Sequence, residues 1–146
     1  MNKTESADLL LKLYETRREP VMREARNWMI TFFPESVEDF MKTMVDEKSS
    51  AYYRMVVSYW DMAASFVNHG AIDEEMFNDV NGEHIMVFSK IEPFLKELRE
   101  KFNNPKMVAN LEKLIMRMPE AKEMLATRRE MMKRWVELRA ETAKSA

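Results

Sequence analysis

The chain has 146 residues, of which 46% are hydrophobic and 33% are charged, and its net charge is −2. This length and composition predict one globular domain with a substantial core and argue against a disordered chain. The sequence has no cysteine, two glycines and two histidines. These counts exclude disulfides, thiolate metal sites and glycine-rich phosphate loops, and they leave little material for acid–base chemistry. The nearly balanced charge argues against nucleic-acid binding.

The sequence predicts neither a secretory signal nor a membrane span. The N-terminus lacks the series of features that marks a signal peptide, namely a basic region, then a long apolar stretch, then a cleavage site of small residues. The longest weakly charged run, residues 51–70, contains Arg54 and Asp61. Two charges near the centre of a spanning helix are costly, so this run is expected to be a buried helix of a soluble protein. With no signal, no membrane anchor and no cysteine, the expected compartment is the cytoplasm.

The order of prolines and capping residues predicts an all-α chain. Met, Leu and Ala outnumber Val and Ile, and straight-chain residues keep more rotamer freedom in helices. Helices are predicted at about 6–18, 20–33, 36–45, 50–69, 73–91, 93–103, 105–118 and 119–142. An irregularity is expected at residues 81–82. The short loops predict one domain over residues 1–146, a bundle of six to eight helical segments.

The helix predicted at residues 50–69 is expected to be central, because it is apolar on almost every side. Its polar residues Arg54, Ser58, Asp61 and Ser65 recur at spacings of four and three, which places them on one narrow stripe. This stripe motivates one functional hypothesis, a small-ligand-binding bundle whose internal pocket the four residues line.

The sequence YWDMAASFVNHGAIDEEMF at residues 59–77, followed by IEPFLKELREKF, carries a recognisable pattern. Its positions are held by Tyr59, Trp60, Asp61, Gly70, Ile72, Asp73, Pro93 and Arg99. This pattern resembles that of a bacterial family of small all-helical proteins catalogued only as a domain of unknown function. Asp61 stands where the family commonly has Glu. The resemblance implies an all-α fold and implies no activity.

Asp61, Arg99 and Arg54 are the candidate residues of a polar core. A buried carboxylate must be paired or protonated. The resemblance implies Arg99 as the partner of Asp61, and Arg54 and Arg26 are alternatives. The prediction is an internal ion pair that fixes helix register. An enzyme that uses Asp61 with a histidine is a third functional hypothesis.

The histidines do not predict a metal site. Neither His69 nor His84 follows a Glu by three residues, as di-metal carboxylate bundles require. Each is expected to lie at a helix end and to interact with terminal carbonyls or with the helix dipole. No catalytic residue, metal or cofactor is predicted.

The last predicted helix carries the interface candidates in a methionine-rich chain. Met124, Met131, Trp135 and Leu138 form one apolar stripe, and Leu125 and Met132 form a neighbouring one. A helix that packs on one surface needs one stripe, so the second stripe favours self-association through a helix that leaves the bundle as an arm. The leading hypothesis is therefore a non-enzymatic protein-interaction module that forms a homodimer.

Overall fold

The computed structural model describes residues 2–145, and helices with short connections make up this part of the chain. In chain order they are α1 (Lys3–Arg17), α2 (Pro20–Thr31), α3 (Val37–Val45), α4 (Glu47–Asn68), α5 (Glu74–Val80), α6 (Glu83–Ile91), the 3₁₀ turn η1 (Glu92–Phe94), α7 (Leu95–Lys101), α8 (Ala109–Met116) and α9 (Ala121–Ser145). The all-α class is confirmed. No helix among the described residues has the length and apolar character that crossing a membrane requires.

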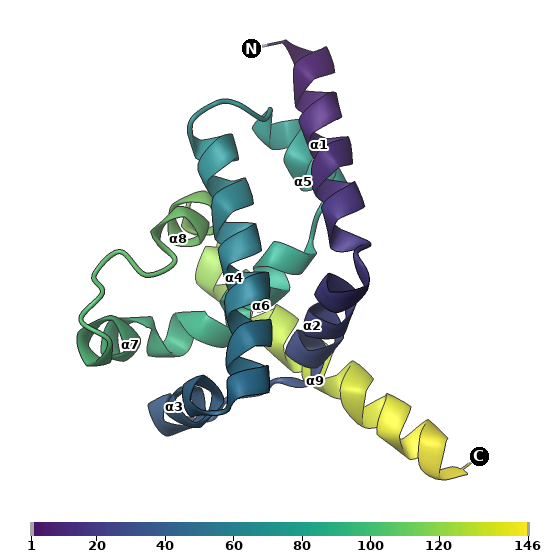
Figure 1. The fold of residues 1–146 in the computed structure, drawn as a ribbon, viewed down its shortest axis with the longest axis vertical. Coiled ribbons are helices and arrows are strands. Elements are labelled where there is room, and N and C mark those ends of the chain that lie inside the picture. Colours follow the sequence, from purple (N-terminus) through teal and green to yellow (C-terminus); the bar gives the residue numbers. More distant parts are fainter. Residues whose placement is uncertain (1, 146) are drawn as a thin grey trace.

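The helix α4 forms the centre of the bundle, as predicted. It packs most extensively against α2 and α8 and also against α3. Figure 1 shows α1 and α2 on one side of α4, with α7 and α8 on the other. Trp60 of α4 is fully buried, together with Phe40, Phe77 and Phe88 from other helices, so the core surrounds the predicted central helix.

Side-chain caps explain where the first helices begin. The side chain of Asn2 accepts a hydrogen bond from the backbone of α1, and Glu19 caps α2, which has Pro20 at its first position. Ser36 caps α3, as the sequence predicts. The gap at residues 46–49 between two predicted helices amounts to the prediction of a loop, and this prediction is wrong. Asp46 alone separates α3 from α4, and its side chain accepts a hydrogen bond from the backbone N–H of Ser49 in the first turn of α4.

The predicted irregularity at residues 81–82 is a break between α5 and α6. The helix expected from Pro105 begins later, at Ala109. Val108 precedes it with a φ of 46°, which is rare for a β-branched residue. Residues 105–108 therefore form a turn, and α8 starts without a side-chain cap from its own chain segment.

The helix α9 packs on the bundle over its first part only. Ala121 and Leu125 are buried, and the main packing partner of the helix is α6. Figure 1 shows the second half of α9 extending past the other helices. The helix continues to Ser145, three residues beyond its predicted end.

Candidate functional site

Asp61 caps the N-terminus of α8 from the neighbouring helix. Its Oδ1 accepts a hydrogen bond from the backbone N–H of Leu111 at 3.0 Å, and its Oδ2 accepts one from Nδ2 of Asn110 at 3.1 Å. The predicted ion pair with Arg99 is therefore wrong. The physical reason lies in α8, whose first backbone donors need an acceptor that Val108 cannot supply. Asp61 is half-buried.

Replacing Asp61 by Ala is expected to lower the free energy of unfolding by about 1–2 kcal/mol, the usual effect of losing an N-terminal cap. The variant Asp61→Asn keeps an oxygen that can accept from the Leu111 N–H, so it is expected to lose less. Urea unfolding of the two variants measures this difference. A loss of less than about 0.5 kcal/mol for Asp61→Ala, the range of neutral surface changes, would contradict the capping role.

Arg99 fixes the connection between α7 and α8. Its guanidinium donates to the carbonyl oxygen of Met107 and, at 2.9 Å, to the carboxylate of Glu112. The two bonds to Met107 join the end of α7 to the turn before α8, and the bond to Glu112 joins it to α8 itself. Arg99 and Asp61 thus have separate structural roles. Arg99 holds α8 through the carboxylate of Glu112, and Asp61 holds it through the backbone N–H of Leu111.

The stripe on α4 does not line an internal pocket, so that part of the ligand-binding hypothesis is wrong. Arg54 and Ser58 are exposed. Arg54 donates to the hydroxyl of Ser50, and Ser58 donates to the carbonyl of Arg54. Ser58 borders an open groove whose other walls include Met22 and Met55. The first half of the polar stripe thus faces outward, whereas Asp61 and Ser65 farther along α4 are half-buried and Asp61 is bonded to α8.

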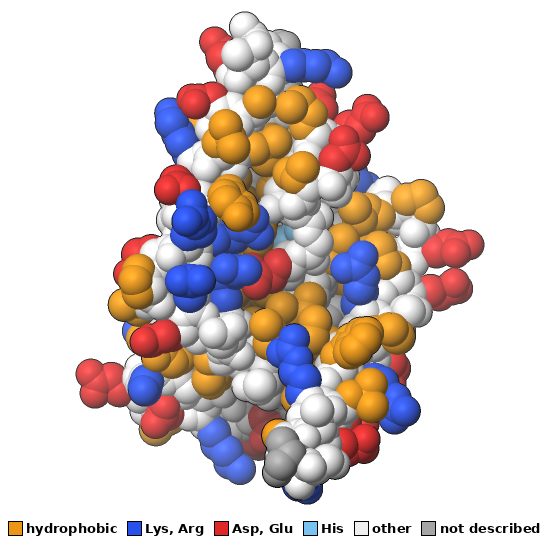
Figure 2. All heavy atoms as spheres, turned by 90° about the vertical axis from the view of Figure 1, so that its right-hand side faces the viewer, with side chains coloured by type: hydrophobic (Ala, Val, Ile, Leu, Met, Phe, Trp, Pro, Cys, Tyr) orange, Lys and Arg blue, Asp and Glu red, His pale blue; other side chains and the backbone are white. Residues whose placement is uncertain are grey.

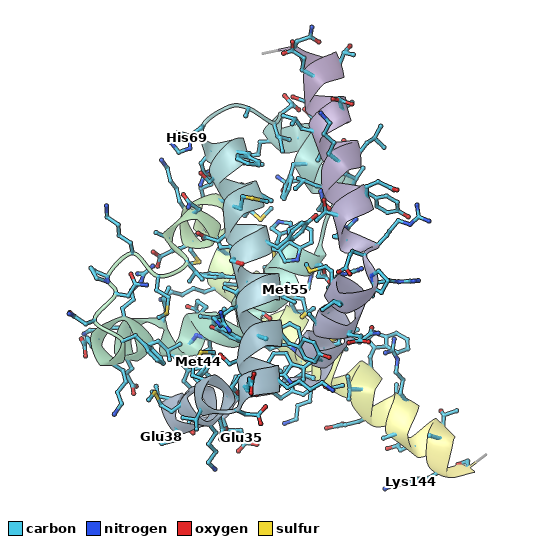
Figure 3. All side chains as sticks on the ribbon, in the orientation of Figure 1. Glu35, Glu38, Met44, Met55, His69 and Lys144 are labelled. Atoms are coloured by element: carbon cyan, nitrogen blue, oxygen red, sulfur yellow. The ribbon has the colours of Figure 1, made fainter. Side chains whose placement is uncertain are left out.

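The two histidines occupy different environments. His69 ends α4, where its Nδ1 lies 2.9 Å from the carbonyl oxygen of Ser65, as expected for a helix-end histidine. Figure 3 shows it at the end of α4 next to the turn into α5. His84 is fully buried. No hydrogen bond within residues 2–145 joins Asp61 to either ring.

His84 packs against the rings of Trp60 and Phe77, at centroid distances of 5.6 Å and 4.9 Å. Neither ring nitrogen has a hydrogen-bond partner among the described residues. Burial, and secondarily the charge of Arg128, lowers the pKa of His84 to about 4. The ring is therefore neutral near pH 7 and acts as an apolar core residue with an unsatisfied polar edge.

Sequence reasoning missed a charged cluster centred on Glu83. Its carboxylate accepts from Nε of Arg26, with both oxygens at 3.0 Å, and from Nε1 of Trp60 at 3.0 Å. The Glu83 side chain is only 12% exposed. The guanidinium of Arg17 lies 5.4 Å from the Trp60 ring. On the face of the molecule that Figure 2 draws, Lys and Arg side chains gather beside acidic ones about midway up.

A signal for this cluster was present in the sequence. Trp60 lies in the middle of an apolar helix, and a buried indole N–H needs an acceptor. The acceptor could not be assigned because Glu83 is 23 residues away and begins α6, a helix whose start the sequence did not separate from α5. The cluster joins α2, α4 and α6 and has the geometry of a structural ion pair.

A second buried cation was also missed. Lys90 is 3% exposed, and its ammonium donates to the carbonyl oxygens of Met29 and, at 2.9 Å, Ile30. It also lies 4.2 Å from the centroid of the Phe33 ring. Burial lowers the pKa of Lys90 to about 7. The contacts show a lysine that satisfies the terminal carbonyls of α2 from α6.

The interface candidates on α9 have different exposures. Met131 is 51% exposed and Trp135 is 57% exposed. Met124 and Leu138 are half-buried, and Met124 packs against the core. Trp135 borders a groove of about 370 Å³ between α9 and the bundle, whose other walls are Ile30, Gly82, Glu83, Met86, Arg128, Met131 and Met132. Figure 2 shows hydrophobic side chains exposed on the lower half of this face.

These contacts define a small helical bundle in which side chains of one helix hydrogen-bond the free backbone groups at the ends of another. Within the described part of the chain, no group of three His, Cys, Asp or Glu residues could hold a metal ion. The family model described as domain of unknown function (DUF4760) matches residues 4–118, and the chain belongs to this family. The resemblance found in the sequence is thereby confirmed. No curated protein and no solved structure matches the chain. The matched residues end before α9.

Proposed function

We propose that this protein is a non-enzymatic interaction module that forms a homodimer through α9. The observation that carries the proposal is the pair of exposed apolar side chains, Met131 and Trp135, on a helix whose second half extends past the bundle. Tryptophan and methionine are enriched at protein interfaces, and tryptophan is a frequent hot spot.

The energetics of the helix support the same proposal. The part of α9 beyond Met132 spans about three and a half turns and has mostly exposed side chains. A helix of this length is marginal in water when no tertiary packing supports it. Contact with a partner along the exposed apolar stripe stabilises the helix and buries Trp135 in the same step.

The positions of the polar residues give no comparable support to an enzyme. Asp61 and Arg99 hold α8, and Glu83 holds Arg26 and Trp60. These three acidic and basic groups have structural partners, whereas Met131 and Trp135 of α9 are among the large apolar side chains that folding of the bundle leaves exposed.

Replacing Trp135 by Ala is expected to weaken the dimer by at least about 2 kcal/mol, the threshold of an interface hot spot. Sedimentation velocity over a range of concentrations measures this change as a shift in the dissociation constant. Val45→Ala is the matched control, because Val45 is also a highly exposed apolar residue but lies at the end of α3. Equal dissociation constants for the wild type and Trp135→Ala would place the contact elsewhere and contradict the proposal.

A further inference from the structure

We infer that the two copies pack antiparallel along the exposed stripe of α9, with Arg134 of each copy beside Glu141 of the other. The inference rests on the proposed self-association through α9 and adds the orientation and register of the contact. The stripe is continued by residues 131, 135, 138 and 142, whose spacings of four, three and four keep them on one side of the helix.

A two-fold axis between residues 136 and 137 pairs the stripe with itself. In this register Trp135 lies opposite Leu138 of the second copy, and Met131 lies opposite Thr142. Trp135 and Met131 are the two large exposed apolar residues of α9. Each pair occurs twice in a two-fold dimer, so this single register buries Met131 and Trp135 of both copies.

The charges beside the stripe favour the antiparallel orientation. Arg134 and Glu141 are seven residues apart on the same flank, and neither has an ion-pair partner within residues 2–145. Antiparallel packing brings these opposite charges together at both ends of the contact. Parallel packing instead places Arg134 near Arg139 of the second copy and sets the two Arg128 side chains against each other, which is repulsive.

The shape of the molecule favours the same orientation. The first part of α9 lies against the bundle, mainly on α6, and the second half extends away from it (Figure 1). Antiparallel packing places the two bundles at opposite ends of the helix pair, whereas parallel packing sets them side by side. The last turns of the second copy then lie beside Arg128 and Met131, where the groove between α9 and the bundle is open.

The absence of cysteine from the chain allows a direct test by disulfide formation. In the antiparallel register the two copies of residue 142 are about 16 Å apart along the helix axis, too far for a disulfide. The variant Thr142→Cys alone is therefore expected to remain uncrosslinked under mild oxidation. An equimolar mixture of Thr142→Cys and Met131→Cys is expected to form the mixed disulfide, because these residues face each other.

Charge reversal tests the flanking pair. Arg134→Glu is expected to raise the dissociation constant about tenfold, because two exposed pairs become repulsive, and the double variant Arg134→Glu/Glu141→Arg is expected to restore it. Lys133→Glu is the matched control, since it makes the same charge change on the opposite side of the helix. It is expected to leave the dissociation constant unchanged.

The outcomes separate this inference from the proposed function. A dimer in which Thr142→Cys crosslinks to itself overturns the antiparallel orientation and leaves self-association through α9 intact. A dimer that forms no mixed disulfide and does not respond to Arg134→Glu overturns the register. A monomeric wild type overturns both proposals, whereas crosslinking of the mixture together with rescue by the double variant supports both.

Discussion

The variant Glu83→Ala is expected to lower the free energy of unfolding by about 3 kcal/mol, at the lower end of the range for breaking a buried ion pair. The change leaves the indole N–H of Trp60, which is fully buried, without its acceptor. It also leaves the guanidinium of Arg26, which is 30% exposed, without its carboxylate. The remaining access of Arg26 to water keeps the expected loss below the upper end of that range.

Urea unfolding measures this loss, and two variants provide the comparison. Glu112→Ala breaks the pair with Arg99, but Glu112 is 41% exposed and Arg99 keeps the carbonyl of Met107. We expect that variant to lose less than about 1 kcal/mol. Glu83→Gln keeps an acceptor for Trp60 and is expected to fall between the two. A Glu83→Ala protein as stable as Glu112→Ala would show that the cluster does not hold α2, α4 and α6 together.

Acid is expected to destabilise the protein through His84 by up to about 3 kcal/mol. The pKa of this histidine falls from 6.5 to about 4 in the folded chain because the ring is buried, with a further contribution from Arg128. Above pH 6.5 the ring is neutral in both the folded and the unfolded chain. Between pH 6.5 and 4 the unfolded chain binds the proton first, so the free energy of unfolding decreases as the pH falls through this window.

The variant His84→Leu separates this effect from the titration of carboxylates. Leucine cannot be protonated, so the difference in stability between the variant and the wild type is expected to grow as the pH is lowered from 6.5 to 4. At pH 7 the variant is expected to be at least as stable, because it removes two buried nitrogens that have no hydrogen-bond partner. Parallel pH profiles of the two proteins from chemical unfolding would contradict the buried, neutral histidine.

The helices could be predicted because their signals are local. Prolines and caps fixed the starts of α2 and α3, and the apolar surface of α4 placed it in the centre. Boundaries failed where a single residue serves two helices, as Asp46 does between α3 and α4. They also failed at α8, because the left-handed backbone of Val108 has no sequence signature in a β-branched residue.

The polar contacts could be predicted only in kind. The sequence indicated that Asp61 needs a partner, but one of its two donors is the backbone of Leu111, which looks the same at every position of a sequence, and the other is the distant side chain of Asn110. Arg26 was named as an alternative partner for Asp61 and binds Glu83 instead. These choices depend on how the helices cross, and periodicity within one helix holds no information about that.

The exposed stripe of α9 is the feature on which the functional account depends. Its apolar residues were recognised from their spacing, and Met131 and Trp135 lie exposed in the structure. The family model matches residues 4–118, so α9 lies outside the matched part of the chain. The proposed function therefore rests on the residues of this chain.

The mass of the unmodified protein in solution tests the central claim most directly. Sedimentation equilibrium at tens of micromolar, without any variant or label, distinguishes one copy from two. Self-association through α9 predicts a species of about twice the chain mass of 17.4 kDa, with dissociation on dilution. A single species of 17.4 kDa at every concentration would contradict the account.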